Sequence, residues 1–172
     1  MLIQYLRLIL FAIGLLVGVQ VPGFVDQYAK RVSAHQMEVA RNFRGFQENA
    51  DQYFAGSVQA LVEHHESSGD DAFKSEGRTI HDMYVRLSAL SAEVDALRAP
   101  LLQRIIHVAV YPNREILNET LAAYTYTVPI NPSAMICGVL SGTVFAMLVE
   151  GLFTLFARLL RPMDVRRVKA RP

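Results

Sequence analysis

The stretch Leu2–Val21, LIQYLRLILFAIGLLVGVQV, decides how this chain of 172 residues is organised. It holds a single charge, Arg7, and has the length of roughly 20 mainly apolar residues that a helix needs to cross the hydrocarbon core of a bilayer. A second stretch of this kind, AMICGVLSGTVFAMLVEGLFTLFA over Ala134–Ala157, also holds a single charge, Glu150. The sequence therefore predicts two membrane-spanning helices.

Residues that start or stop helices mark the limits of both spans. Pro22 and Gly23 are expected to end the first span, whereas Asn131 can cap the second and Pro132 suits its first position. We expect a first transmembrane helix over residues 1–22, a central domain over 23–133, a second transmembrane helix over 134–158 and a tail over 159–172. The alternative for the first stretch is a cleaved signal peptide, but Val17–Gln20 lacks the small-x-small pattern of a cleavage site.

The composition agrees with a chain of which only part is apolar. The mean hydropathy of +0.22 lies between the values typical of a soluble domain and of a polytopic transporter. The charged residues, 19% of the chain, fall almost entirely outside the two spans. The single cysteine, Cys137, excludes an internal disulfide framework and a Cys-rich zinc site.

The distribution of Lys and Arg predicts the orientation of the spans. The segment 22–133 carries ten basic and fourteen acidic residues, and it is too long for its basic residues to hold it inside the cell. We expect both termini in the cytoplasm and the central domain in the periplasm of a bacterial inner membrane. The basic tail is expected to contact anionic lipid headgroups, and nucleic acid is not an expected partner. The residues of this lipid contact are Arg158, Arg161, Arg166, Arg167, Lys169 and Arg171.

Two glycines and one charged residue in each span lie at matching depths if the helices form an antiparallel pair. The matched positions have numbers that add to 156 or 157, and they are Gly18 with Gly138, Gly14 with Gly142, and Arg7 with Glu150. Small residues let helices approach closely, and an intramembrane charge is costly unless it is paired. We therefore expect the spans to pack through the glycines. We also expect an ion pair between Arg7 and Glu150, either within one chain or between two subunits.

Between the spans, apolar residues recur every three or four positions in two long stripes, the pattern of a helix that buries one narrow face, as in a coiled coil. The first stripe is Val25, Tyr28, Val32, His35, Val39, Phe43, Phe46, Ala50 and Tyr53, and the second is Ile80, Met83, Leu87, Leu90, Val94, Leu97 and Leu101. Ser57 can cap a short helix that ends at Glu66, and Asp70 or Asp71 can cap the next. The predicted fold class is all-α, with two transmembrane helices flanking a long antiparallel helical hairpin.

The return to the membrane begins near Pro100. Leu101–Val110 is too short to span a bilayer and is unusually apolar, so we expect it either to lie in the membrane interface or to pack as a buried helix. A further short helix is expected within residues 112–122, and residues 124–129 are expected to be extended.

Catalytic motifs are not found: the sequence holds no G-x-S-x-G, Walker loop, dinucleotide fingerprint, C-x-x-C or H-E-x-x-H. No metal and no cofactor are expected. Glu63-His64-His65-Glu66 is the densest group of potential ligands, but neighbouring histidines on a helix point about 100° apart, so we interpret it as a solvated helix end. His35, within the first stripe, is either a satisfied histidine at a helix contact or a residue that contacts a ligand or acts as a pH switch. Asn118-Glu119-Thr120 matches a glycosylation acceptor, which means little in a bacterial host.

Two motifs lie near the ends of the spans. The first is Gly18-Val19-Gln20-Val21-Pro22-Gly23-Phe24, which continues into Gln27-Tyr28 and Lys30-Arg31, and the second is Thr127-Val128-Pro129-Ile130-Asn131-Pro132. Together they resemble the motifs of a family of proteobacterial two-span inner-membrane proteins known only as a domain of unknown function. Gly23 departs from that family, which usually has an acidic residue there. The resemblance implies a location and a shape, but it implies no activity and no catalytic residues.

We expect a non-enzymatic structural or accessory subunit that self-associates or joins a larger membrane complex through its hairpin and its glycine-rich spans. The alternative is a periplasmic module that senses a ligand or pH and acts through a partner protein. The short tail counts against an autonomous receptor, because it cannot hold an output domain.

Overall fold

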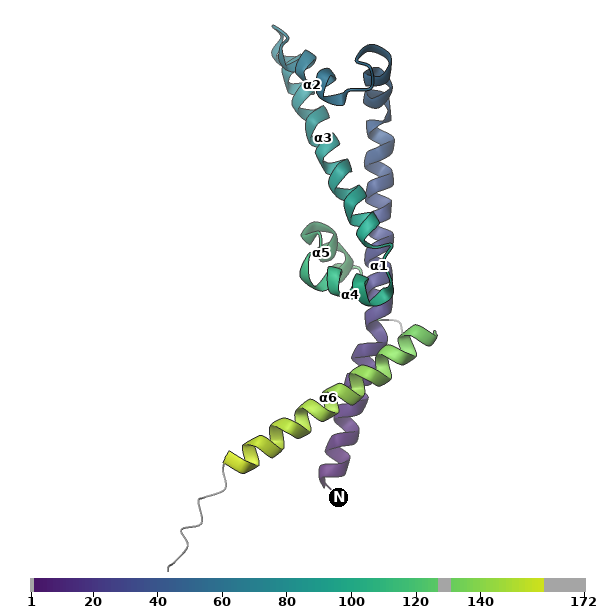
Figure 1. Ribbon diagram of the computed structural model, residues 1–172, viewed down its shortest axis with the longest axis vertical. Helices are drawn as coiled ribbons and strands as arrows, with labels where there is room; N and C mark the ends of the chain where they lie inside the picture. Colours follow the sequence, from purple (N-terminus) through teal and green to yellow (C-terminus); the bar gives the residue numbers. More distant parts are fainter. Residues whose placement is uncertain (1, 127–130, 160–172) are drawn as a thin grey trace, which may run out of the picture. The chain divides into compact units, whose positions relative to one another are not determined.

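The computed structural model describes residues 2–126 and 131–159, with side chains over 4–126 and 131–155. This part of the chain consists of six α-helices and contains no strand, which confirms the all-α class (Figure 1). The helices are α1 (Leu2–Tyr53), α2 (Val58–Glu66), α3 (Asp71–Ala96), α4 (Leu101–Val110), α5 (Arg114–Ala122) and α6 (Pro132–Leu159). They form two units, which we call the terminal unit (Met1–Gly23 with Tyr126–Pro172) and the central unit (Phe24–Thr125).

Helix α1 runs without interruption through Pro22 and Gly23, so the helix continues beyond the residues predicted to end the first span. A proline inside a helix removes one backbone hydrogen bond and costs about 3 kcal/mol. The side chains of Val19 and Val25, on either side of Pro22, are both buried. Their burial favours the helical conformation on both sides of the proline and offsets the lost hydrogen bond.

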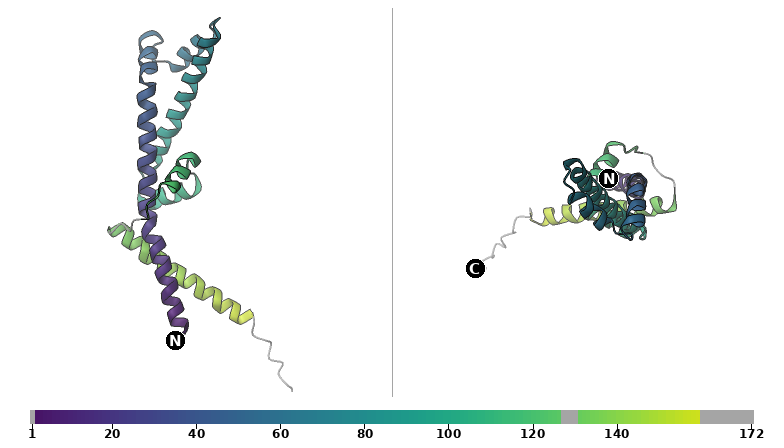
Figure 2. Two further views of the ribbon diagram at one scale, coloured as in Figure 1. Left: turned by 180° about the vertical axis from the view of Figure 1, so that it is seen from behind. Right: turned by 90° about the horizontal axis from the view of Figure 1, so that it is seen from above.

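The terminal unit consists of α6 and the N-terminal part of α1. Each of these two helices contains a segment long and apolar enough to cross a membrane. Helix α6 begins as predicted, because Pro132 is its first residue and Asn131 Oδ1 accepts a hydrogen bond from the backbone N–H of Ala134 at 2.8 Å. Figures 1 and 2 show α6 crossing the N-terminal part of α1 obliquely.

In the central unit, the remainder of α1 and α3 lie side by side as the two arms of a hairpin (Figures 1 and 2). The chain reverses through Ala55 and Gly56, which both have positive φ angles of 51° and 82°. Ser57 Oγ then accepts from Ala60 N at 3.1 Å and caps α2. Asp70 Oδ1 accepts from Ala72 N at 2.8 Å and caps α3. The predicted caps of both helices are therefore confirmed, with Asp70 rather than Asp71 in the second.

Two apolar clusters hold the hairpin together. The buried residues of cluster 1 are Val25, Tyr28, Val32, Leu90, Leu97, Val108 and Ile116. Those of cluster 2 are Phe43, Ala50, Val58, Leu61, Val62 and Ile80. Because early residues of α1 meet late residues of α3, the two arms are antiparallel. Tyr53, the last residue of the first predicted stripe, is 68% exposed, because α1 ends there and the next residue, Phe54, packs against cluster 2 instead.

Helices α4 and α5 complete the central unit beside cluster 1. One face of α4 packs Val108 and Ile105 into that cluster. Its other face leaves Leu102, Ile106 and Val110 exposed at 68%, 53% and 56%. The sequence predicts that this helix either lies in the membrane interface or is buried. In the structure, α4 has one packed face and one exposed apolar face. The extended segment predicted over residues 124–129 lies mostly outside the described residues.

Candidate functional site

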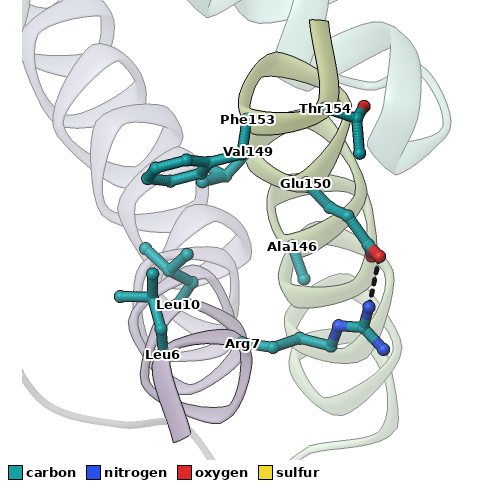
Figure 3. Close-up of a pocket in the computed structure, with 8 residues that line it drawn as sticks. All are labelled: Leu6, Arg7, Leu10, Ala146, Val149, Glu150, Phe153 and Thr154. Carbon is teal, nitrogen blue, oxygen red and sulfur yellow. Dashed lines mark hydrogen bonds and ion pairs between the residues drawn. The ribbon is translucent and has the colours of Figure 1, made fainter. Parts of the chain in front are cut away.

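Arg7 of α1 and Glu150 of α6 meet within the terminal unit. Arg7 Nη2 donates a hydrogen bond to Glu150 Oε1, and the two groups form an ion pair (Figure 3). Both side chains are about half exposed, 55% for Arg7 and 50% for Glu150. In this structure both partners of the ion pair belong to the same chain. Such pairing removes much of the cost of placing two charges on apolar helices.

An apolar recess of about 450 Å³ opens beside this ion pair. It is lined by Arg7 and Glu150 together with Leu6, Leu10, Ala146, Val149, Phe153 and Thr154. Figure 3 shows Leu10, Val149 and Phe153 gathered together, away from the ion pair, so the recess is apolar at one end and charged at the other. A second recess of about 410 Å³ shares Arg7, Ala146 and Glu150 and is otherwise lined by Gln4, Leu8, Phe11, Thr143 and Met147. The ion pair therefore borders two recesses.

The backbones of the two helices are in close contact at Gly14 and Gly142. A Cβ atom added at Gly14 would lie 2.9 Å from the Cα of Gly142, and one added at Gly142 would lie 2.9 Å from the carbonyl oxygen of Phe11. These distances are too short for any side chain, so only glycine permits this crossing. The structure thus brings this predicted pair of glycines into direct contact.

The other two glycines contact different partners from those expected. A Cβ at Gly18 would lie 2.7 Å from the carbonyl oxygen of Cys137 and would collide with Ser141, and one at Gly138 would collide with Val19 and lie 3.2 Å from the carbonyl oxygen of Leu15. Gly18 and Gly138 are therefore not each other's nearest neighbours. Because the helices cross obliquely, residues one turn away from Gly14 and Gly142 are displaced sideways relative to each other.

Ser141 joins the two helices and was not singled out from the sequence. Its hydroxyl donates to the carbonyl oxygen of Gly14 at 2.6 Å and also lies 3.2 Å from that of Gly138. A hydrogen bond between helices adds to close packing where both helices are otherwise apolar. The available signal was a pair of hydroxyl residues, Ser141 and Thr143, on either side of Gly142 in an apolar stretch.

The remaining predictions for the terminal unit concern the tail. Arg161, Arg166, Arg167, Lys169 and Arg171 lie outside the described residues, as does the side chain of Arg158. Their contact with anionic lipid stays a prediction. Cys137 is a free cysteine of intermediate exposure.

In the central unit, His35 is part of a charged group that links α1 to α5. His35 Nε2 lies 2.9 Å from Glu119 Oε2, and Arg31 Nη1 lies 3.6 Å from the same oxygen. The hydrogen bond with His35, and then the charges of His35 and Arg31, hold the pKa of the Glu119 carboxyl below its usual value. Thr120 is buried and its hydroxyl donates to the carbonyl oxygen of Ile116 at 2.7 Å, so the glycosylation-like triplet is a structural part of α5.

A second polar group crosses cluster 1, and sequence reasoning missed it. Tyr28 is fully buried, and its hydroxyl donates to Glu93 Oε1 at 2.6 Å and accepts from the backbone N–H of Asn113 at 2.8 Å. His107 Nε2 lies 3.0 Å from the same Glu93 oxygen without forming a hydrogen bond to it. The group thus ties α1, α3 and α4 to the start of α5. The signal was Glu93 itself, an acidic residue three positions after Leu90 and four before Leu97 of the second apolar stripe.

The Glu63–Glu66 segment lies at the end of α2 and is only partly solvated. His65 Nδ1 is 2.9 Å from the carbonyl oxygen of Leu61, and its ring packs against Phe73. Within the part of the chain that the structure describes, no three His, Cys, Asp or Glu side chains are grouped as metal ligands.

Comparison with known proteins gives a family without an assigned activity. The family described as "Protein of unknown function (DUF2937)" matches residues 2–162, nearly the whole chain. No curated protein and no solved structure matches it.

Proposed function

The chain belongs to this family of proteins of unknown function, and we propose that it is a non-enzymatic subunit of a bacterial inner membrane. In this proposal α6 and the N-terminal part of α1 cross the bilayer, and the central unit lies in the periplasm. The protein self-associates or joins a larger membrane complex through these helices and the hairpin.

The observation that carries the membrane location is the apolar surface of the terminal unit. Large side chains of α1 that point outward are Tyr5, Leu8, Ile9, Ile13, Leu16 and Val17, and those of α6 include Met135, Ile136, Val139, Leu140, Val144, Met147, Leu148, Leu152 and Leu155. A water-soluble monomer rarely exposes so large a continuous apolar surface. Lipid covers such a surface without cost, and the ion pair and the glycine contact are then what holds the two helices together.

The uncovered face of α4 extends the same argument to the central unit. Leu102, Ile106 and Val110 are spaced by four residues and lie along one side of the helix. We place this face in the headgroup region of the periplasmic leaflet, where a short amphipathic helix can rest. The opposite face remains packed in cluster 1.

Topology is tested with single cysteines in a Cys137→Ser background. Gly69→Cys lies in the turn between α2 and α3, where an added side chain meets no other atom, and Lys169→Cys lies in the tail. In intact spheroplasts a membrane-impermeant maleimide should label the first thiol and should label the second only after permeabilisation. The reverse pattern, or release of the protein by alkaline carbonate, would overturn the proposed location.

Self-association is tested by co-expressing two copies with different tags and purifying one of them in mild detergent. Recovery of the second copy, or a native mass well above the 19.3 kDa of one chain, is expected. A monomer that carries no other protein, and that a small molecule stabilises saturably, would contradict the subunit proposal.

The group around His35 favours a second candidate function, a pH-sensing module. Because the pKa of Glu119 is lowered, this carboxylate contributes stability above about pH 4.5 that is lost as the pH falls through its lowered pKa. The imidazole of His35 makes its strongest bond to Glu119 when it carries a second proton, and the bond weakens when that proton is lost. Glu119 of α5 and Arg31 of α1 are the charged groups that face it.

Hydrogen exchange separates this candidate from the first. In a pH sensor the amides of α5, corrected for intrinsic rates, should lose protection between pH 5.5 and pH 8, and His35→Gln should abolish this change. His81→Gln, an exposed histidine of α3, is the matched control and should behave like the native protein. Equal protection at both pH values would leave the structural role as the only candidate.

A further inference from the structure

Among the residues that the structure describes, the ion pair of the terminal unit uses only a small part of its hydrogen-bonding capacity. A guanidinium group has five N–H donors and a carboxylate about four acceptor positions. In the described part of the chain, the bond between Arg7 and Glu150 is the one interaction recorded for either side chain. Both side chains are half exposed, so these unused donors and acceptors face whatever surrounds the helices.

The recess beside the pair has the form of a binding site for an amphiphile. Its volume of about 450 Å³ is within the usual range for small-molecule pockets, and its lining is apolar except for the ion pair and Thr154. The hydroxyl of Thr154 already donates to the carbonyl oxygen of Gly151 at 2.8 Å. The polar contacts available to a ligand are therefore concentrated at the ion pair, at one end of an apolar recess (Figure 3).

The position of Arg7 along α1 fits a lipid headgroup. Arg7 precedes Pro22 by fifteen residues, which is about 22 Å along a helix, whereas the hydrocarbon core is about 30 Å thick. If Pro22 lies at the periplasmic boundary, the side chain of Arg7 can reach the headgroups of the cytoplasmic leaflet. The lining residues Leu10, Ala146 and Val149 then lie on the side of the ion pair that faces the acyl chains.

We propose that this recess binds a zwitterionic aminophospholipid, whose phosphate accepts hydrogen bonds from Arg7 and whose primary ammonium donates to Glu150. The inference rests on the membrane location proposed above. Because the ion pair carries no net charge, it offers no general attraction for an anionic lipid. A choline headgroup lacks N–H donors for Glu150, and a glycerol headgroup lacks a cation.

The test measures lipid retention by the full chain. The protein is purified from membranes in mild detergent and exposed to equal amounts of dioleoyl phosphatidylethanolamine, phosphatidylcholine and phosphatidylglycerol, and bound lipid is counted by native mass spectrometry. One phosphatidylethanolamine should be retained about tenfold over the other two lipids, as expected for hydrogen bonds to charged groups. The double variant Arg7→Gln, Glu150→Gln should lose this preference without leaving a charge unpaired.

A matched pair of substitutions tests the recess itself. Ala146→Phe fills the recess, because Ala146 lines both cavities, and it should abolish retention. Leu148→Phe, on an exposed residue two positions away that lines neither cavity, should leave it unchanged. Circular dichroism checks that each variant is folded. If Ala146→Phe does not fold, the lipid preference of the double variant Arg7→Gln, Glu150→Gln decides whether the ion pair binds the headgroup.

Equal retention of the three lipids would overturn the inference, as would a preference that survives the double variant. A lipid-free dimer whose contact is broken by Ala146→Phe would show instead that a second copy fills the recess, and would also overturn it. If the protein also resists carbonate extraction, these outcomes overturn the lipid inference but leave the proposed membrane location intact. A protein released by carbonate contradicts the location itself.

Discussion

The hydroxyl of Tyr28 provides the sharpest prediction about the central unit. It lies on a fully buried side chain and satisfies two groups, the carboxylate of Glu93 and the backbone N–H of Asn113. Tyr28→Phe keeps the ring and removes only the oxygen atom. Glu93 then loses a short hydrogen bond, and the Asn113 N–H is left without its acceptor.

The expected cost follows from these two contacts. A hydrogen bond to a charged group contributes about 1.5–3 kcal/mol, and an unsatisfied buried donor costs about 1–3 kcal/mol. Because His107 remains beside Glu93, we expect the total loss to be about 3 kcal/mol rather than the sum of the upper limits. Tyr53→Phe is the matched control, since Tyr53 is 68% exposed, and it should change stability by less than about 0.5 kcal/mol.

The assay is amide hydrogen exchange of the full chain in mild detergent. The opening free energy of α3 and of the start of α5 should fall by the stated amount in Tyr28→Phe and should stay at the native value in Tyr53→Phe. A loss below about 0.5 kcal/mol in the first variant, within the range of an ordinary surface substitution, would refute the assigned role of the hydroxyl.

The pH dependence of the same variant supplies an independent check. Burial, and secondly the bond to Glu93, raise the pKa of Tyr28 above its ordinary value of 10.0. A raised pKa means that the contribution of Tyr28 is fully present below about pH 10 and is lost as the pH rises through the folded value. The difference in stability between the native protein and Tyr28→Phe should therefore be constant from pH 7 to pH 9 and shrink above pH 10. A difference that grows with alkaline pH would contradict the raised pKa.

Three further predictions concern the helix pair and the hairpin turn. Gly14→Ala should destabilise the helix pair by about 1–3 kcal/mol in micelle unfolding, because the new Cβ lies 2.9 Å from Gly142 Cα. Gly45→Ala, where an added Cβ meets no other atom, should stabilise the chain by about 0.5–1 kcal/mol. Equal effects of Gly14→Ala and Gly45→Ala on stability would contradict the close crossing of α1 and α6. Glu150→Gln should leave Arg7 unpaired at a cost of about 2–3 kcal/mol and lower the amount of protein in the membrane; failure of an added Arg7→Gln to restore it would count against the pair. Ala55→Gly should raise the unfolding midpoint, since φ is +51° at that residue and relief of this strain gains about 1 kcal/mol; an unchanged or lower midpoint would show that the turn is not strained there.

Much of the helical framework could be predicted from local patterns. The caps at Ser57, Asp70 and Asn131 are side-chain to backbone contacts within three residues, so short sequence patterns suffice to find them. Apolar spacing identified most of the buried face of each arm, because a residue every three or four positions returns to the same side of a helix. Local reasoning failed at Pro22, where its usual helix-breaking effect is outweighed by packing on both sides.

The sequence by itself therefore determined which segments are helical, which are apolar enough for a membrane, and that Arg7 and Glu150 could meet. Only the tertiary structure decided which polar atoms come together. Tyr28 with Glu93, and Ser141 with Gly14, join residues that are far apart in the chain. Such contacts depend on how each helix is rotated about its own axis and how it crosses its neighbour. Periodicity reports which face of a helix is buried, but it contains no information on what that face meets.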